Sequence, residues 1–137
     1  SDVLRVDNEG LLIVNLQAKS DILTTWVFMN NEGHVIVEHG ELCLRGGARN
    51  DGLIEVLADG ILNVCDGIIT HTDNGTVTNN GTIITNPGTV TEVTGDVYLS
   101  GPWIINGTVI VYVWSVECQH PVGAVWWHFA PLRLSAD

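Results

Sequence analysis

The chain has 137 residues, which is the usual size of one domain with its own core. Its 16 acidic residues outnumber 5 lysines and arginines, and the formal charge of −11 argues against binding to nucleic acid or anionic lipid. Charged residues make up only 15% of the chain, against about 25% in an average domain, and hydrophobic residues make up 45%.

This composition indicates exposed apolar surface, which usually marks an interface. It favours a protein that assembles over a threonine-rich secreted domain with no such surface. No apolar run approaches the roughly 20 residues of a membrane-spanning helix, so membrane insertion is not expected. The single lysine, Lys19, and the richness in threonine and asparagine favour an extracellular or cell-surface location.

Residues 1–32 are expected to form N-terminal strands. Two apolar runs, at 3–6 and 11–14, are separated by the turn signal Asp7-Asn8-Glu9-Gly10. Residues 18–21 could open a short helix, whereas residues 24–28 favour a strand. A second turn follows at Asn30-Asn31-Glu32-Gly33.

Residues 33–107 are expected to form a glycine-punctuated repeat. From Gly52 to Gly107 a glycine returns every six to eight residues, and β-branched residues fill most of the intervals. Each glycine would cost a helix about 1 kcal/mol relative to alanine, so a helix is excluded. The remaining alternatives are a β-solenoid, which uses such short strands, and a β-sandwich or jelly roll joined by hairpins at Asn74-Gly75 and Asn80-Gly81.

Glycine intervals added in threes favour the solenoid. Gly40, Gly60, Gly81 and Gly101 are 20, 21 and 20 residues apart, which fits one coil of a three-faced solenoid. Three residues just before turns recur at intervals of 20 and predict a corner ladder with side-chain hydrogen bonds from coil to coil: Asp66, Asn86 and Asn106.

The three cysteines show no metal-binding spacing. Cys43 and Cys65 are 22 residues apart, so they could occupy neighbouring positions in adjacent coils and form a disulfide. The alternative is that the cysteines are small buried hydrophobic residues.

Residues 108–137 are expected to form longer aromatic strands without glycine punctuation, at 109–116 and 124–129. The open edges of a solenoid need a cap or a neighbouring subunit. Both ends of the chain therefore predict an assembly interface, made by Val3, Leu4, Val6, Leu11, Ile13, Trp114, Trp126, Trp127 and Phe129.

The Asn-Gly-Thr units at 74–76, 80–82 and 106–108, followed by valine or isoleucine, resemble the repeats of secreted bacterial adhesins and other surface β-solenoids. The resemblance covers residues 33–107 and implies a structural role at a surface, without catalytic residues. The chain lacks the GGxGxDxUx motif of calcium-bound β-rolls.

No cluster of polar residues predicts a metal, a cofactor or catalysis. His34, Glu38, His39 and Glu41 are close in sequence, but alternation on a strand separates them, and zinc needs three or four convergent ligands. His71 with Asp73 lacks a nucleophile. His120 and His128 are expected to pack or to lie at an interface.

These patterns predict a non-enzymatic extracellular protein of one all-β domain, most simply a short β-solenoid with longer terminal strands. It would assemble with copies of itself into a filament, sheath or surface layer by strand addition and aromatic burial. A glycan-binding or adhesion module, with Trp103 on an aromatic platform, is the alternative. A third hypothesis is a glycan-processing β-helix enzyme that uses Glu55 and Glu92.

Overall fold

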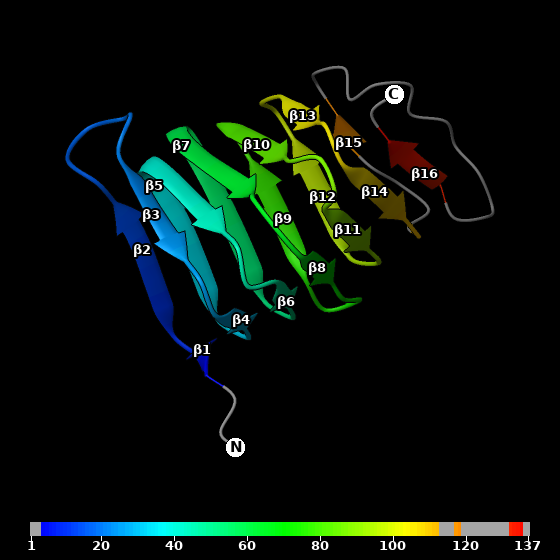
Figure 1. Cartoon of the computed structure of the whole chain (residues 1–137), viewed down its shortest axis with the longest axis horizontal. Helices are drawn as coiled ribbons and strands as arrows, with labels where there is room; N and C mark the ends of the chain where they lie inside the picture. Colours follow the sequence, from blue (N-terminus) through cyan, green and yellow to red (C-terminus); the bar gives the residue numbers. More distant parts are fainter. Residues whose placement is uncertain (1–3, 113–116, 119–131, 136–137) are drawn as a thin grey trace.

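The computed structural model describes residues 4–112, 117–118 and 132–135. These residues form a β-solenoid of about five turns and contain no helix, which confirms the predicted fold class. Strands of successive turns lie side by side along the long axis, from the N-terminal end to the C-terminal end (Figure 1). Neighbouring coils pair in parallel, which excludes the hairpin-built sandwich.

Three faces surround one core. The first face contains β1 (Arg5–Asn8), β4 (Phe28–Asn31), β6 (Ala48–Asn50), β8 (Ile68–His71), β11 (Val90–Val93) and β14 (Thr108–Val111). The second contains β2 (Leu11–Asn15), β9 (Thr76–Asn79), β12 (Asp96–Leu99) and β15 (Glu117–Cys118), and the third contains β3 (Ile22–Thr25), β10 (Thr82–Thr85) and β13 (Trp103–Ile105). The long strands β5 (His34–Leu44) and β7 (Leu53–Val64) continue from the second face into the third.

We number the complete turns coil 1 (residues 5–25), coil 2 (28–44), coil 3 (48–64), coil 4 (68–85) and coil 5 (90–105). The strands β14 and β15 begin a sixth turn. The last strand, β16 (Leu132–Ser135), pairs with β14 in the antiparallel direction and so covers the C-terminal edge of the first face.

The register confirms a coil of about 20 residues. On the first face one register position holds Met29, Ala48, Ile69, Thr91 and Val109, at intervals of 19, 21, 22 and 18 residues. The repeat begins earlier than predicted, because residues 5–32 form coil 1 and the start of coil 2. Their glycines are sparse, but the strands of coil 1 pair in parallel with those of the next coil.

The core consists of the inward side chains of all three faces. Valine, isoleucine and leucine occupy most of these positions, and Val35, Leu44 and Ile54 have no exposed surface. Fully burying one such side chain contributes about 1.5–3 kcal/mol, so stacked aliphatic columns supply most of the stability.

Candidate functional site

The first coil lies at one end of the described solenoid. Each of β1, β2 and β3 has a parallel neighbour in coil 2, and no other described strand pairs with their outer edges. Unpaired N–H and C=O groups along such edges can pair with a strand of another chain.

Coil 1, the residue before it and the corner after it also expose large apolar side chains. Seven of the eleven exposed large hydrophobic residues of the described structure lie here, so the apolar surface is concentrated at this end. Val6 and Leu23 stand in register with the buried Met29 and Leu42, and they are exposed because no described coil covers them. The residues of this first-coil apolar surface are Leu4, Val6, Leu11, Ile13, Ile22, Leu23 and Trp26.

The sequence analysis predicted part of this surface. Leu4, Val6, Leu11 and Ile13 are exposed, whereas the predicted interface residues Val3, Trp114, Trp126, Trp127 and Phe129 lie outside the described residues. Three residues of this surface were not predicted: Ile22, Leu23 and Trp26. Ile22 and Leu23 form an apolar pair just before the strand signal at 24–28, and Trp26 lies within that signal.

Trp26 is the most prominent aromatic residue of this surface, with 74% of its area exposed. The Arg45 guanidinium lies 5.2 Å from the centre of its ring, within the range of a cation–π interaction. A large aromatic side chain next to an arginine is a common composition for the centre of a protein interface.

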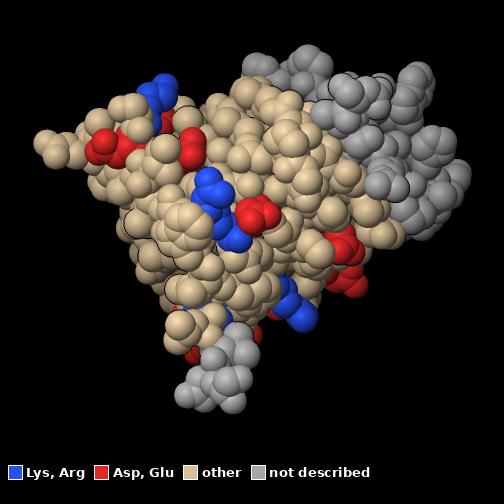
Figure 2. All heavy atoms as spheres, in the orientation of Figure 1, with Lys and Arg blue, Asp and Glu red and all other residues tan. Residues whose placement is uncertain are grey.

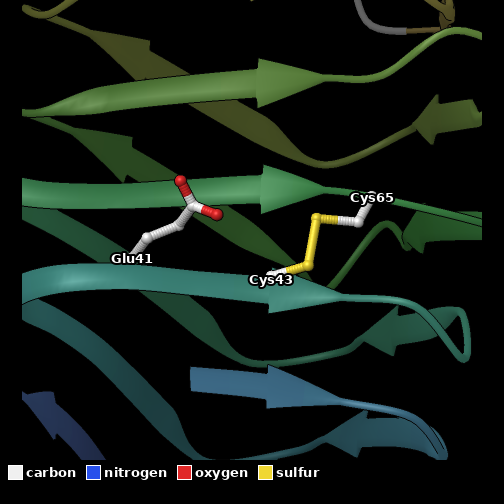
Figure 3. A group of neighbouring side chains, drawn as sticks. All are labelled: Glu41, Cys43 and Cys65. Atoms are coloured by element: carbon white, nitrogen blue, oxygen red, sulfur yellow. A yellow bond between two sulfur atoms is a disulfide. The ribbon is translucent and has the colours of Figure 1, made fainter. Parts of the chain in front are cut away.

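A disulfide joins Cys43 and Cys65, as the 22-residue spacing suggested, with 5.7 Å between their Cα atoms. Cys43 pairs with Asn63 in the sheet register, and Cys65 lies two residues beyond Asn63, on the same face. Figure 3 shows Glu41 and Cys43 on β5 and Cys65 just beyond the end of β7.

The Glu41 carboxylate and the two sulfur atoms lie within 4.8 Å of one another. Cysteine ligates metals as the thiolate, so the disulfide removes two of these three ligands. Instead, the Asn63 side chain donates a hydrogen bond to Glu41 Oε2 at 3.5 Å. This group therefore cross-links coils 2 and 3.

An interior ladder of amides runs along the corner between the first and second faces. Asn8 Nδ2 donates to Asn31 Oδ1 at 3.0 Å, and Asn31 Nδ2 donates to Asn50 Oδ1 at 2.9 Å. Asn50 Nδ2 then donates to His71 Nδ1 at 3.2 Å. Asn31 and Asn50 have no exposed surface, and we call this set of four residues the amide ladder.

Each rung also satisfies its local backbone. The Oδ1 atoms of Asn31 and Asn50 accept from the backbone N–H of Gly33 and Gly52, two residues on. The Nδ2 group of Asn31 donates to the Leu53 carbonyl in the next coil. A buried amide has four hydrogen-bonding positions, and this arrangement fills those of Asn31 and Asn50.

The glycines of this corner allow the coils to approach closely. A Cβ atom on Gly52 would lie 2.2 Å from the Gly33 carbonyl oxygen, and one on Gly33 would lie 2.2 Å from that of Gly10. The sequence signal for the amide ladder is therefore Asn-(Glu/Asp)-Gly at 8–10, 31–33 and 50–52, a motif that the glycine count did not separate from other turns.

His71 ends the amide ladder. Since Asn50 Oδ1 accepts from two N–H groups, its Nδ2 side must donate, and His71 Nδ1 must accept as a neutral imidazole. Burial lowers the pKa of His71 to about 4, which keeps the ring neutral at physiological pH. The residue in register in the next coil is Val93, which cannot continue the ladder.

The side chains of Asp66, Asn86 and Asn106 do not form the predicted hydrogen-bonded corner ladder. Asn86 and Asn106 do follow paired residues, Thr85 and Ile105, but among the described residues no side-chain hydrogen bond joins them to each other or to Asp66. The prediction assumed asparagine in a left-handed corner, whereas only glycines have positive φ in the described chain. Asp66 and Asn106 are exposed, so water can satisfy their side chains.

The side chains of His34, Glu38, His39 and Glu41 do not converge on a common point where they could bind a metal. His34 Nε2 lies 3.2 Å from Glu55 Oε1 of the next coil, and His39 Nδ1 lies 2.8 Å from the Leu16 carbonyl oxygen. Glu38 is exposed. Alternation and a register shift between Val37 and His39 send these side chains to different neighbours.

The residues considered for glycan chemistry are also apart. Trp103 is only 8% exposed and faces the core, so the predicted aromatic platform is wrong at this residue. Glu55 lies on the second face and Glu92 on the first, and buried His71 faces inward while Asp73 is exposed. His120 and His128 lie outside the described residues.

Charge is sparse on the face shown in Figure 2, where a few acidic and basic side chains are separated by wide uncharged areas. The described part of the chain contains no helix with the length and apolar composition of a membrane-spanning segment. Comparisons with protein-family models, curated proteins and solved structures gave no match.

Proposed function

We propose that this protein is a non-enzymatic extracellular structural subunit that assembles with copies of itself through its first coil. The main support is the coincidence of three strand edges that no described strand pairs with and the first-coil apolar surface. Strand addition would satisfy the edge hydrogen bonds, and burial of Trp26 and the aliphatic side chains would supply affinity. A filament, sheath or surface layer is the class of product that this mechanism would build.

The amide ladder adds a chemical requirement for the incoming strand. Asn8 Nδ2 donates to coil 2, and no described residue donates to Asn8 Oδ1. An incoming copy that places an N–H donor at this corner would satisfy this acceptor. The two ends of the solenoid also differ, because β16 covers β14 at the C-terminal end.

The disulfide supports an extracellular location. Disulfides persist in oxidising compartments and are rare in the reducing cytosol. Cys43 and Cys65 form one between coils 2 and 3. The chain also has few charged groups, a composition more typical of an assembled surface than of a dispersed domain.

A glycan-binding module has less support. Trp103 is buried, and the exposed Trp26 lies after coil 1, far from the exposed Tyr98 in coil 5 and from Tyr112 just after β14. The enzyme hypothesis has less still, since Glu55 and Glu92 lie on different faces.

Substitution of Ile22, which is 59% exposed on β3, tests the proposal. Ile22→Lys places a charge in the first-coil apolar surface and should reduce self-association at least about tenfold, the effect of losing about 1.4 kcal/mol. The matched control is Ile68→Lys on β8, where isoleucine is 53% exposed in the middle of the solenoid. Sedimentation velocity over a concentration series gives the association constants.

The wild-type chain and the Ile68→Lys variant should form the same large species, visible also by negative-stain microscopy. Added salt should strengthen them, because copies of charge −11 repel one another. A wild-type chain that stays monomeric at every concentration, or equal effects of the two variants, would refute assembly through the first coil.

A further inference from the structure

A small cavity lies inside the solenoid between coils 3, 4 and 5. It leaves about 10 Å³ for the centre of a water molecule. Every residue that lines it is buried, and most are aliphatic. Four lining residues carry hydrogen-bonding groups: His71, Thr85, Thr91 and Trp103.

Three of these groups have no hydrogen-bond partner among the described residues. They are Thr85 Oγ1, Thr91 Oγ1 and Trp103 Nε1, in side chains that are 0%, 1% and 8% exposed. Buried polar atoms in folded proteins nearly always have a partner, which is either a protein group or an ordered water. Three unpaired groups around one cavity therefore indicate a shared partner inside it.

In coils 4 and 5 the three polar residues replace apolar residues of the inward-facing columns. Thr85 stands between Val64 and Ile105, and Thr91 stands between Ile69 and Val109. Trp103 follows Ile83 in a column that is aliphatic in the earlier coils. Three separate columns thus change to hydrogen-bonding residues where they meet the cavity.

The size of the cavity fixes the class of ligand. A buried water needs roughly 10–15 Å³ of such space and two to four polar partners. This cavity meets both conditions, and it is too small for a metal with its ligand shell or for an organic molecule.

We propose that the cavity binds one long-lived water molecule, which links coil 4 to coil 5. Trp103 Nε1 can only donate, so the water oxygen accepts from the indole. The two water hydrogens are then available to the hydroxyl oxygens of Thr85 in coil 4 and Thr91 in coil 5. The water is a structural element of the core and does not depend on the assembly proposed above.

Magnetic relaxation dispersion of water oxygen tests the inference, because it counts internal waters of long residence. Wild type should contain one more such water than the Thr85→Val/Thr91→Val variant. Valine is close to threonine in shape but cannot bind the water. Thr25→Val is the matched control, because Thr25 Oγ1 is also unpaired among the described residues, lies in the same column as Thr85, and does not line the cavity.

A second measurement needs no variant. In a water-selective nuclear Overhauser experiment on wild type, the indole proton of Trp103 should show a direct cross-peak to water of the sign expected for a bound molecule. An unchanged water count in a folded double variant, or the absence of this cross-peak, would overturn the proposal. An equal loss of water in Thr25→Val would also overturn it.

Discussion

Coils 1 to 3 and coils 4 to 5 bury polar groups in different ways. In the first three coils an asparagine occupies the same corner of each turn, and its side chain forms a hydrogen bond with the asparagine of the next turn. In the later coils the buried polar groups are different residues on different faces, and three of them meet at a cavity. One solenoid core can therefore bury polar groups in two ways: as identical residues that bond from turn to turn, or as different residues gathered around one cavity.

His71 stands at the border between the two halves. Its Nδ1 accepts the hydrogen bond that Asn50 Nδ2 donates, and its ring lines the cavity. His71 therefore takes part both in the amide ladder and in the lining of the cavity.

The largest effect should come from Asn50→Ala. The substitution removes the partner of Asn31 Nδ2, the Gly52 N–H, the Thr76 carbonyl and His71 Nδ1, all at a buried position. We expect the free energy of unfolding to fall by about 4 kcal/mol, because each unsatisfied buried group costs about 1–3 kcal/mol and part of this cost is relaxed. Urea denaturation followed by circular dichroism measures the loss.

Asn79→Ala is the matched substitution in the later coils. Asn79 is equally buried, but among the described residues its side chain bonds only to the Pro102 carbonyl and the Gly81 N–H. The expected loss is about half as large, about 2 kcal/mol. If the two losses were equal, stacking in the amide ladder would add nothing to an isolated buried amide.

The next effect should come from removing the disulfide, which joins coils 2 and 3. Closing a loop of 22 residues stabilises a chain by about 3 kcal/mol in the chain-entropy description. The Cys43→Ala/Cys65→Ala variant and reduced wild type should both lose this amount in guanidinium denaturation. Amide hydrogen exchange should accelerate in coils 2 and 3 more than in coil 5, and a uniform acceleration would contradict the local effect.

The smallest of the three effects is a pH dependence from His71. Its pKa is about 4 in the folded chain, below the ordinary value of 6.5, so the unfolded chain binds more protons between these values. The stabilisation is complete above pH 6.5 and decreases as the pH falls towards 4. Between pH 7 and pH 5 we expect a loss of about 2 kcal/mol from this residue.

The control for this dependence is His71→Asn. The amide oxygen can still accept from Asn50 Nδ2, but the side chain does not titrate. The difference between the two stability curves from pH 7 to pH 5 isolates His71. Parallel curves would show that the buried imidazole is not the source.

The sequence predicted the fold because the solenoid repeats its strands and corners at a nearly constant interval. The glycines at 40, 60, 81 and 101 indicated coils of about 20 residues, and the Cys43–Cys65 spacing of one coil plus two residues placed both sulfurs on one face. These features depend on spacing alone, and spacing is visible in a sequence.

Other features depend on which side of a strand faces inward. A shift of one residue turns a strand over, so the burial of Trp103 could not be deduced from periodicity. The amide ladder was visible in principle, as Asn-(Glu/Asp)-Gly, but at intervals of 23 and 19 residues that differ from the glycine rhythm. The cavity depends on how side chains of three coils pack together, which no single interval encodes.

The amide ladder also gives the chain a modular length. Residues 29–47 make up one full coil, and Asn31 accepts from the rung before it and donates to the rung after it in the same way. A tandem duplication of this segment would therefore add a coil whose asparagine accepts from the rung before it and donates to the rung after it. Lengthening within the ladder would thus change the number of these side-chain hydrogen bonds and leave their kind unaltered.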